Sequence, residues 1–143
     1  MAIYGLDWLL KSYGEEYLVL EYNHLFVSDT IREEIWLLQR KNDSHLIENI
    51  LQAAAAFSIH DADADRPLNT YSGGQQAILA CLLVMAAIRV AKLNGVKLLL
   101  NNILNSISED NRRTLYQRFH EIRKTHGVGF YTTANGRVEE ITC

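Results

Sequence analysis

The chain has 143 residues, of which 48% are hydrophobic and 22% charged, and its formal net charge is −3. This composition is that of a soluble globular protein, and the length suits one domain, residues 1–143, with its own core. A negative net charge argues against a strongly basic nucleic-acid surface, so we do not expect direct contact with nucleic acid. Two cysteines, Cys81 and Cys143, make no disulfide framework, and the start of the chain lacks the basic segment of a signal peptide. We therefore expect a reduced, cytoplasmic setting.

Residues 1–58 predict a mostly helical region with one strand. In chain order, we expect a short helix at 3–12, a strand at 16–22, a helix at 30–41 capped by Ser28 or Asp29, and a helix at 45–57 begun by Ser44. The apolar positions of both later helices are spaced to face a core, and neither helix carries a chemical motif.

Residues 59–70 predict an acidic loop that contains the only proline. Asp61, Asp63 and Asp65 alternate there, as in a calcium-binding loop. An EF-hand loop needs glycine at its sixth position and glutamate at its twelfth, and this chain has Arg66 and Ser72 there. We therefore expect a solvated loop and no metal site.

Residues 71–143 predict alternating helices and strands. We expect a helix from Ser72 to near Asn94-Gly95, a strand at 96–100, a helix at 109–125 ended by His126-Gly127, a strand at 128–133, a turn at Asn135-Gly136 and a return strand. The apolar run 77–88 is too short to span a bilayer, so we expect a buried core helix, with Cys81 inside it, and no membrane span. This alternation is typical of an α/β fold with a parallel sheet.

The segment YSGGQQ, residues 71–76, stands at the start of that apolar helix. The first N–H groups of a helix lack partners within it, and the helix dipole places partial positive charge there. Two glycines allow close approach, and Ser72 adds a hydroxyl donor. The segment therefore has the features of a phosphate site, although Ser-Gly-Gly also forms an ordinary helix start.

The order of segments over residues 68–141 resembles the C-terminal half of an ABC-type ATPase. Residues 71–75 match the signature motif, with tyrosine in place of leucine, and LLLNNILNSIS, residues 98–108, lies where the Walker B strand and D-loop would be. VGFYTT, residues 128–133, is similar to the strand that leads to the switch histidine. Upstream, residues 20–37 are similar to the segment after the Q-loop, with Glu21 or Tyr22 near the place of the glutamine.

The resemblance implies a truncated P-loop NTPase-like α/β core, with mostly parallel strands and an N-terminal helical region. The apolar helix after the signature and the long spacing from Ser72 to Asn101 look more like the heads of SMC and double-strand-break-repair ATPases than like transporter ATPases.

Several parts that the family uses for hydrolysis are missing. No glycine is followed by lysine, so the chain contains no P-loop. Asn101 and Asn102 replace the magnesium-linked aspartate and the glutamate that activates water, and an amide cannot accept a proton from water near neutral pH. The D-loop proline and aspartate correspond to Ile103 and Ser108, and the switch histidine to Thr132 or Thr133. We therefore expect no catalytic residues and no intrinsic cofactor, with ATP and Mg²⁺ only alongside a partner.

Three functions remain open. The first is a non-catalytic ABC-ATPase-like binding, regulatory or scaffolding module that docks on a related ATPase, or on itself as a homodimer. In the family, the signature of one subunit closes over ATP held by the other, which makes Ser72, Gly73, Gly74 and Gln75 candidate phosphate contacts in trans. The second is the signature-bearing half of a split ATPase, and the third is a small structural α/β adaptor with no nucleotide role.

Overall fold

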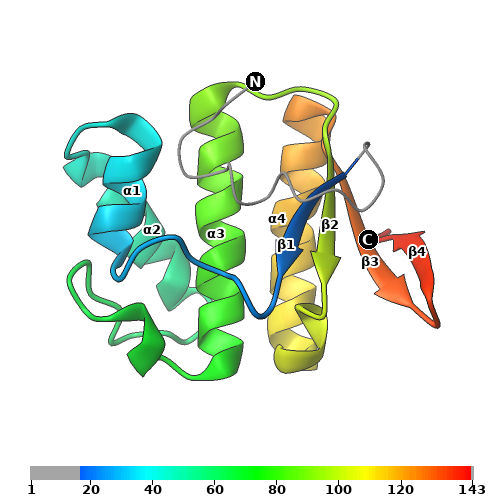
Figure 1. Ribbon diagram of the computed structural model, residues 1–143, viewed down its shortest axis with the longest axis horizontal. Helices are drawn as coiled ribbons and strands as arrows, with labels where there is room; N and C mark the ends of the chain where they lie inside the picture. Colours follow the sequence, from blue (N-terminus) through cyan, green and yellow to red (C-terminus); the bar gives the residue numbers. More distant parts are fainter. Residues whose placement is uncertain (1–16, 143) are drawn as a thin grey trace.

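The computed structural model describes residues 17–142, in which one strand and three helices are followed by alternating strands and a helix (Figure 1). The strands are β1 (Tyr17–Glu21), β2 (Lys97–Asn101), β3 (Gly129–Ala134) and β4 (Arg137–Glu140). The α-helices are α1 (Ile31–Gln39), α2 (Ser44–Ala55), α3 (Gly73–Ala91) and α4 (Glu109–His126), and the short 3₁₀ helices are η2 (Leu68–Thr70) and η3 (Leu104–Ser106). The helix expected at 3–12 lies outside the described residues.

The strands form a single sheet in the order β1-β2-β3-β4, with the first three parallel and β4 antiparallel to β3. Leu98 and Leu100 of β2 belong to the main core, while Leu99 between them is buried outside it. Alternate residues of a strand point to opposite faces, so β2 is buried on both faces, as its apolar run predicts. The α/β class with mostly parallel strands is confirmed.

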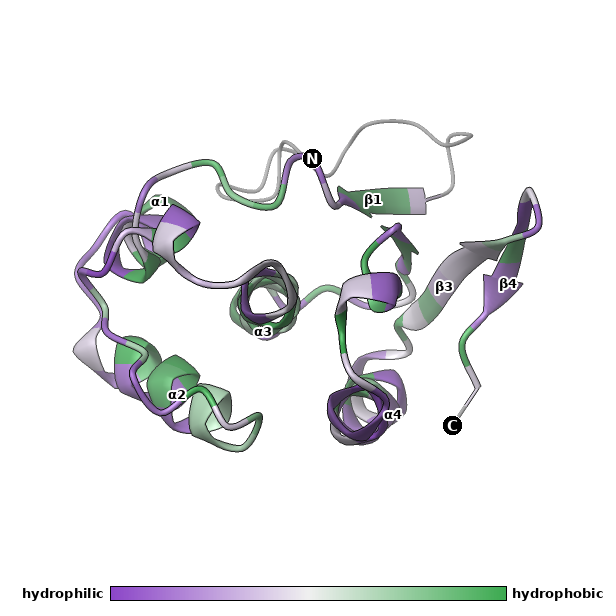
Figure 2. Ribbon diagram, turned by 90° about the horizontal axis from the view of Figure 1, so that it is seen from below, coloured by the Kyte–Doolittle hydropathy of each residue, from purple (hydrophilic) through white to green (hydrophobic). Residues whose placement is uncertain are grey.

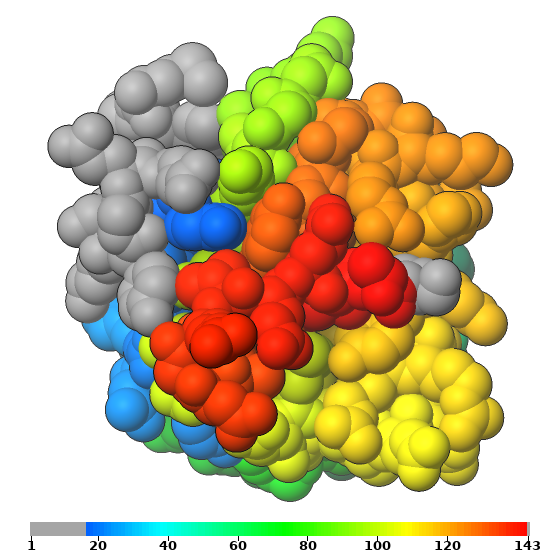
Figure 3. Space-filling view, turned by 90° about the vertical axis from the view of Figure 1, so that its right-hand side faces the viewer, coloured from blue at the N-terminus to red at the C-terminus, as the bar shows by residue number. Residues whose placement is uncertain are grey.

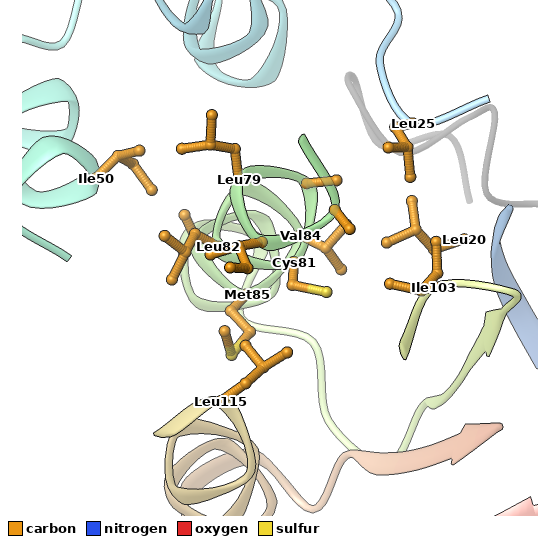
Figure 4. Close-up of a cluster of buried hydrophobic side chains, with 14 of the residues drawn as sticks. Leu20, Leu25, Ile50, Leu79, Cys81, Leu82, Val84, Met85, Ile103 and Leu115 are labelled. Carbon is orange, nitrogen blue, oxygen red and sulfur yellow. The ribbon is translucent and has the colours of Figure 1, made fainter. Parts of the chain in front are cut away.

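Two layers of helices lie on one side of the sheet. Figure 2 shows α3 and α4 beside the sheet, with α1 and α2 on the far side of α3. Residues 77–88 of α3 are all buried except Leu83. Figure 4 shows Leu82 and Met85 of α3 between Ile50 of α2 and Leu115 of α4, while Cys81 is fully enclosed. The expectation of a buried core helix is confirmed.

By length and composition, α3 would also be apolar enough to cross a membrane. Within the fold, 61% of its most apolar window is buried. Core helices of soluble proteins pass the same test, so α3 alone is weak evidence for a membrane span.

Helices α1 and α2 end two residues before the predicted 41 and 57. Three further differences concern two N-terminal caps and the end of α3. Thr30 caps α1 in place of Ser28 or Asp29, because its extended backbone lets its hydroxyl accept from Glu33 N. Asp43, not Ser44, caps α2 in the same way by accepting from Leu46 N.

The third is the end of helix α3, which stops before the Asn94-Gly95 signal. Lys92 takes a left-handed conformation (φ 53°), and the Leu93 N–H bonds back to the Ile88 carbonyl at 3.1 Å. Because Leu93 is buried there, its side chain turns the chain off the helix early. By contrast, the predicted end of α4 is confirmed by Gly127, at φ 64°.

The acidic loop is held by arginines. Asp65 pairs with Arg32 of α1 and Asp61 with Arg66, each with an N–O distance of 2.7 Å. Hydrogen bonding to Arg32 lowers the pKa of Asp65. Both aspartates remain largely exposed, in agreement with the expected solvated loop, and residues 17–142 contain no group of three side chains placed to hold a metal ion.

Asn135 and Gly136 form the predicted turn between β3 and β4, with φ values of 53° and 76°. Both residues are in the left-handed region that a two-residue hairpin of this kind requires. Figure 3 shows the hairpin, in orange and red, on the surface beside α4.

Candidate functional site

The predicted site residues Ser72, Gly73, Gly74 and Gln75 form the start of α3. Ser72 is the N-cap, and its Oγ accepts from Gln75 N at 3.2 Å. The Gln75 side chain returns the bond by accepting from Ser72 N at 3.1 Å. This reciprocal capping box satisfies two N–H groups that a helix start otherwise leaves open. The Ser72 hydroxyl and the Gln75 amide therefore already have a role within the chain.

The two glycines pack against different parts of the chain. A Cβ added to Gly74 would lie 2.5 Å from the backbone carbonyl oxygen of Ser106, in η3. A Cβ added to Gly73 would collide with the hydroxyl of Tyr22, which follows β1. Both glycines thus allow the helix start to sit against the segments that leave β1 and β2.

Two N–H groups remain at this helix start. In the described part of the chain, the backbone N–H groups of Gly73 and Gly74 have no hydrogen-bond acceptor. Ser72 beside them is exposed, and both glycines are half-exposed. With the partial positive charge of a 19-residue helix, this arrangement favours an anion arriving from outside.

A row of polar side chains crosses the carboxyl ends of the three parallel strands. Asn101 Nδ2 donates to Glu21 Oε2 at 2.6 Å, and Thr133 Oγ1 donates to Asn101 Oδ1 at 2.9 Å. These residues come from β1, β2 and β3. Glu21 and Asn101 are register partners, and Thr133 follows Thr132, the last paired residue of β3 on this side. Both ends of the Asn101 amide therefore have partners, and Asn101 joins the other two side chains.

Asn102 extends this row toward solvent. It takes a left-handed backbone conformation (φ 60°), which asparagine tolerates better than most residues, and its side chain is exposed. Its Nδ2 donates to Glu21 Oε1 at 3.4 Å, so the two carboxylate oxygens of Glu21 each accept from a different asparagine. Two neutral amides thus surround one carboxylate.

Tyr22 connects the row to the helix start. Its backbone N–H donates to the Asn101 carbonyl at 3.2 Å, while its hydroxyl lies against Gly73. The row and the helix start share one edge of the sheet but face opposite sides of it, because Glu21, Asn101 and Thr133 alternate with the residues that face α3. In open α/β sheets, this edge is the usual place for ligands.

The structure brings together positions that the sequence places far apart. Glu21, Asn101, Asn102 and Thr133 meet at one edge, whereas Thr132, the alternative to Thr133, bonds the Leu100 carbonyl instead. Ile103 is buried, and Ser108 caps α4.

Sequence reasoning missed the role of Glu21 as the partner of both asparagines. The sequence placed Glu21 at the end of an apolar strand and near the Q-loop position, but neither signal pointed to the asparagines. The contacts of Tyr22 and Ser106 with the glycines had no signal in the sequence, because a close approach between distant segments leaves no local pattern.

A scan against models of known protein families found no match to this chain, and a comparison with curated proteins found no similar sequence.

Proposed function

We propose that this protein is a non-catalytic, ABC-ATPase-like binding or regulatory module that docks on a related ATPase, or on a second copy of itself, through the start of α3. One observation carries the proposal. Ser72 is exposed at a helix start where the N–H groups of Gly73 and Gly74 lack acceptors within the described chain. A phosphate held by another subunit would supply those acceptors.

The polar row supports the non-catalytic part of the proposal. Asn101 is neutral, and its amide donates a hydrogen bond to Glu21 and accepts one from Thr133. Glu21 is the one carboxylate in the row, and both of its oxygens accept hydrogen bonds from asparagines. The neutral amides of Asn101 and Asn102 cannot accept a proton from water near neutral pH, which a general base at these positions would have to do.

A first experiment measures ATP binding and turnover by the isolated protein. Calorimetric titration with ATP and Mg²⁺ is expected to give weak or no binding, and a phosphate-release assay no turnover. Micromolar binding together with measurable turnover would overturn the proposal.

A second experiment tests the docking face. Sedimentation of the wild type with ATP and Mg²⁺, alone and with a candidate P-loop ATPase, is compared with that of Ser72→Arg. Arginine there removes the cap and places a long side chain over Gly73 and Gly74. The control is Thr30→Arg, which removes an equivalent cap from α1. Complex formation that is lost in Ser72→Arg and kept in Thr30→Arg supports the proposal, while equal behaviour of the two variants contradicts it.

The two other functions predict different results. If the chain is the signature-bearing half of a split ATPase, adding the P-loop half produces turnover that Ser72→Arg abolishes without preventing assembly. The capping box and the close packing of both glycines favour a structural adaptor. In that case Ser72→Arg lowers stability and leaves partner binding unchanged.

A further inference from the structure

A groove runs between α2 and α4, over the part of α3 that lies away from the helix start. One hollow of about 720 Å³ lies between α3 and α4, and a second of about 470 Å³ lies between α2 and α3. Arg89 of α3 and Arg118 of α4 line both, so the two hollows meet at these arginines. Figure 2 shows α2 and α4 on either side of α3.

The α2 side of the groove combines apolar and polar side chains. Leu46 and Ala53 of α2 are partly exposed in its lining, Ile50 of α2 and Leu82 and Met85 of α3 lie buried beneath, and Asn49 and Gln52 of α2 are exposed beside them. Val90, at the edge, is one of the large hydrophobic side chains that remain exposed (38%). Apolar side chains in a hollow next to an exposed valine favour an occupant that brings apolar groups of its own.

The α4 side of the groove carries two like charges. Partial burial lowers the pKa of Arg89, and the nearby positive charge of Arg118 lowers it further. Within residues 17–142, neither guanidinium forms an ion pair with a carboxylate, and Arg118 instead lies 5.8 Å from the Phe57 ring centroid. The other titratable groups that line this side are His120 and Glu121, and both are exposed. Two unpaired arginines beside these apolar side chains leave a place for a carboxylate from outside.

We propose that this groove binds an amphipathic helix of a partner protein, whose apolar side chains enter between α2 and α3 and whose carboxylate pairs with Arg89 and Arg118. The apolar side chains of the lining favour a peptide over a nucleic-acid backbone, which would offer phosphates but no apolar side chains. The surface is separate from the start of α3, because Arg89 lies near the opposite end of that helix. The inference therefore does not depend on the proposed function.

The test is a selection of displayed random peptides, each about four helical turns long, on the immobilised full-length protein. Enriched peptides are expected to carry apolar residues at helical spacing, together with aspartate or glutamate. In fluorescence anisotropy, a selected peptide should bind Arg118→Gln and Arg89→Gln each about tenfold more weakly, the effect of losing one charge-assisted pair. Arg113→Gln is the control, because Arg113 lies on the same helix but pairs with Glu109 and Asp110 and does not line the groove.

Circular dichroism confirms that each variant is folded, and a second test reverses the charges. A peptide with lysine in place of its acidic residue should regain affinity for the double variant Arg89→Glu/Arg118→Glu. Failure to enrich any peptide, enrichment without acidic residues, or equal binding by Arg118→Gln and Arg113→Gln would each overturn the inference. So would tight binding of a single-stranded DNA oligonucleotide that depends on Arg89 and Arg118, since it would assign the groove to nucleic acid.

Discussion

The Asn101 amide nitrogen lies 2.6 Å from a carboxylate oxygen of Glu21. This hydrogen bond explains in structural terms why an asparagine suits position 101. An aspartate at the same position would set two carboxylates against each other across neighbouring parallel strands. The asparagine instead donates to Glu21 and accepts from Thr133, which joins all three parallel strands. The neutral amide at position 101 thus complements the negative charge at position 21.

Asn101→Asp is expected to destabilise the protein by about 1–2 kcal/mol at neutral pH, because it replaces a hydrogen bond to a carboxylate with like-charge repulsion. Urea denaturation measures the change. Adding Glu21→Gln should restore most of the loss, since the introduced amide would then donate to the new carboxylate. Asn102→Asp is the comparison, and its smaller expected effect follows from its exposure and its longer contact of 3.4 Å. Equal losses in the two single variants would contradict this account.

Gly74→Ala is expected to cost about 1–3 kcal/mol, as overpacking in a close contact usually does. The new methyl group would lie 2.5 Å from the Ser106 carbonyl oxygen, and backbone in η3 would have to move. Gly73→Ala meets only the end of the Tyr22 side chain, which can rotate away, so its cost should be smaller. Chemical denaturation of the two variants side by side compares their losses of stability. A larger loss in Gly73→Ala would contradict the view that the contact with the Ser106 backbone is the tighter of the two.

Ser72→Ala is expected to cost about 1 kcal/mol, the usual value of a helix cap. If the capping box acts as a unit, Gln75→Ala adds little once Ser72 has been replaced. A double-mutant cycle on the free energy of unfolding measures this coupling. Purely additive effects would mean that the reciprocal bonds at 3.2 and 3.1 Å do not support each other.

Glu34 gives the stability a distinct pH dependence. Its carboxylate is buried at the start of α1 and accepts from the N–H groups of Val27 and Ser28 at 2.6 and 3.1 Å. Burial raises its pKa above the ordinary 4.5, against the opposing effect of these bonds. Its stabilising contribution is therefore fully present below the ordinary pKa and is lost as the pH rises through the higher pKa of the folded state.

The wild type should consequently gain stability relative to Glu34→Gln as the pH falls from neutral to the ordinary pKa of 4.5. Urea denaturation at neutral pH, at that pKa and midway between them measures this difference. Glu33→Gln provides the reference for losing one negative charge at the start of α1, because Glu33 directly precedes Glu34 and is exposed. A constant difference between wild type and Glu34→Gln over this range would contradict the expected effect of burial.

Most of the described fold could be predicted from the sequence, because its signals are local. Strand β2 is a short apolar run, Gly127 ends α4, and Asn135-Gly136 makes the hairpin turn. These residues carry their conformational preference within a few positions of themselves. The wrong caps of α1 and α2 arose because several capping residues stand together, and only the backbone path decides which of them is used.

The candidate site was predictable only in part. Residues 72–75 could be predicted because a helix start and its cap are formed by neighbouring positions of the sequence. The Glu21–Asn101–Thr133 row was not, since its members are separated by 80 and 32 positions and meet only through strand pairing. The contacts of Gly73 with Tyr22 and of Gly74 with Ser106 depend in the same way on tertiary packing.

The parallel pairing of β1 with β2 also shapes how the chain reaches its fold. Tyr17 pairs with Lys97, so β1 finds its neighbour only after α1, α2 and α3 have been made and brought back against the sheet. Strands β2 and β3 need only α4 between them. Contacts between distant segments form slowly, because loop closure costs entropy before they can stabilise the chain. During synthesis, the apolar residues of β1 therefore stay without their strand partner, in contact with water or a chaperone, until β2 has been made.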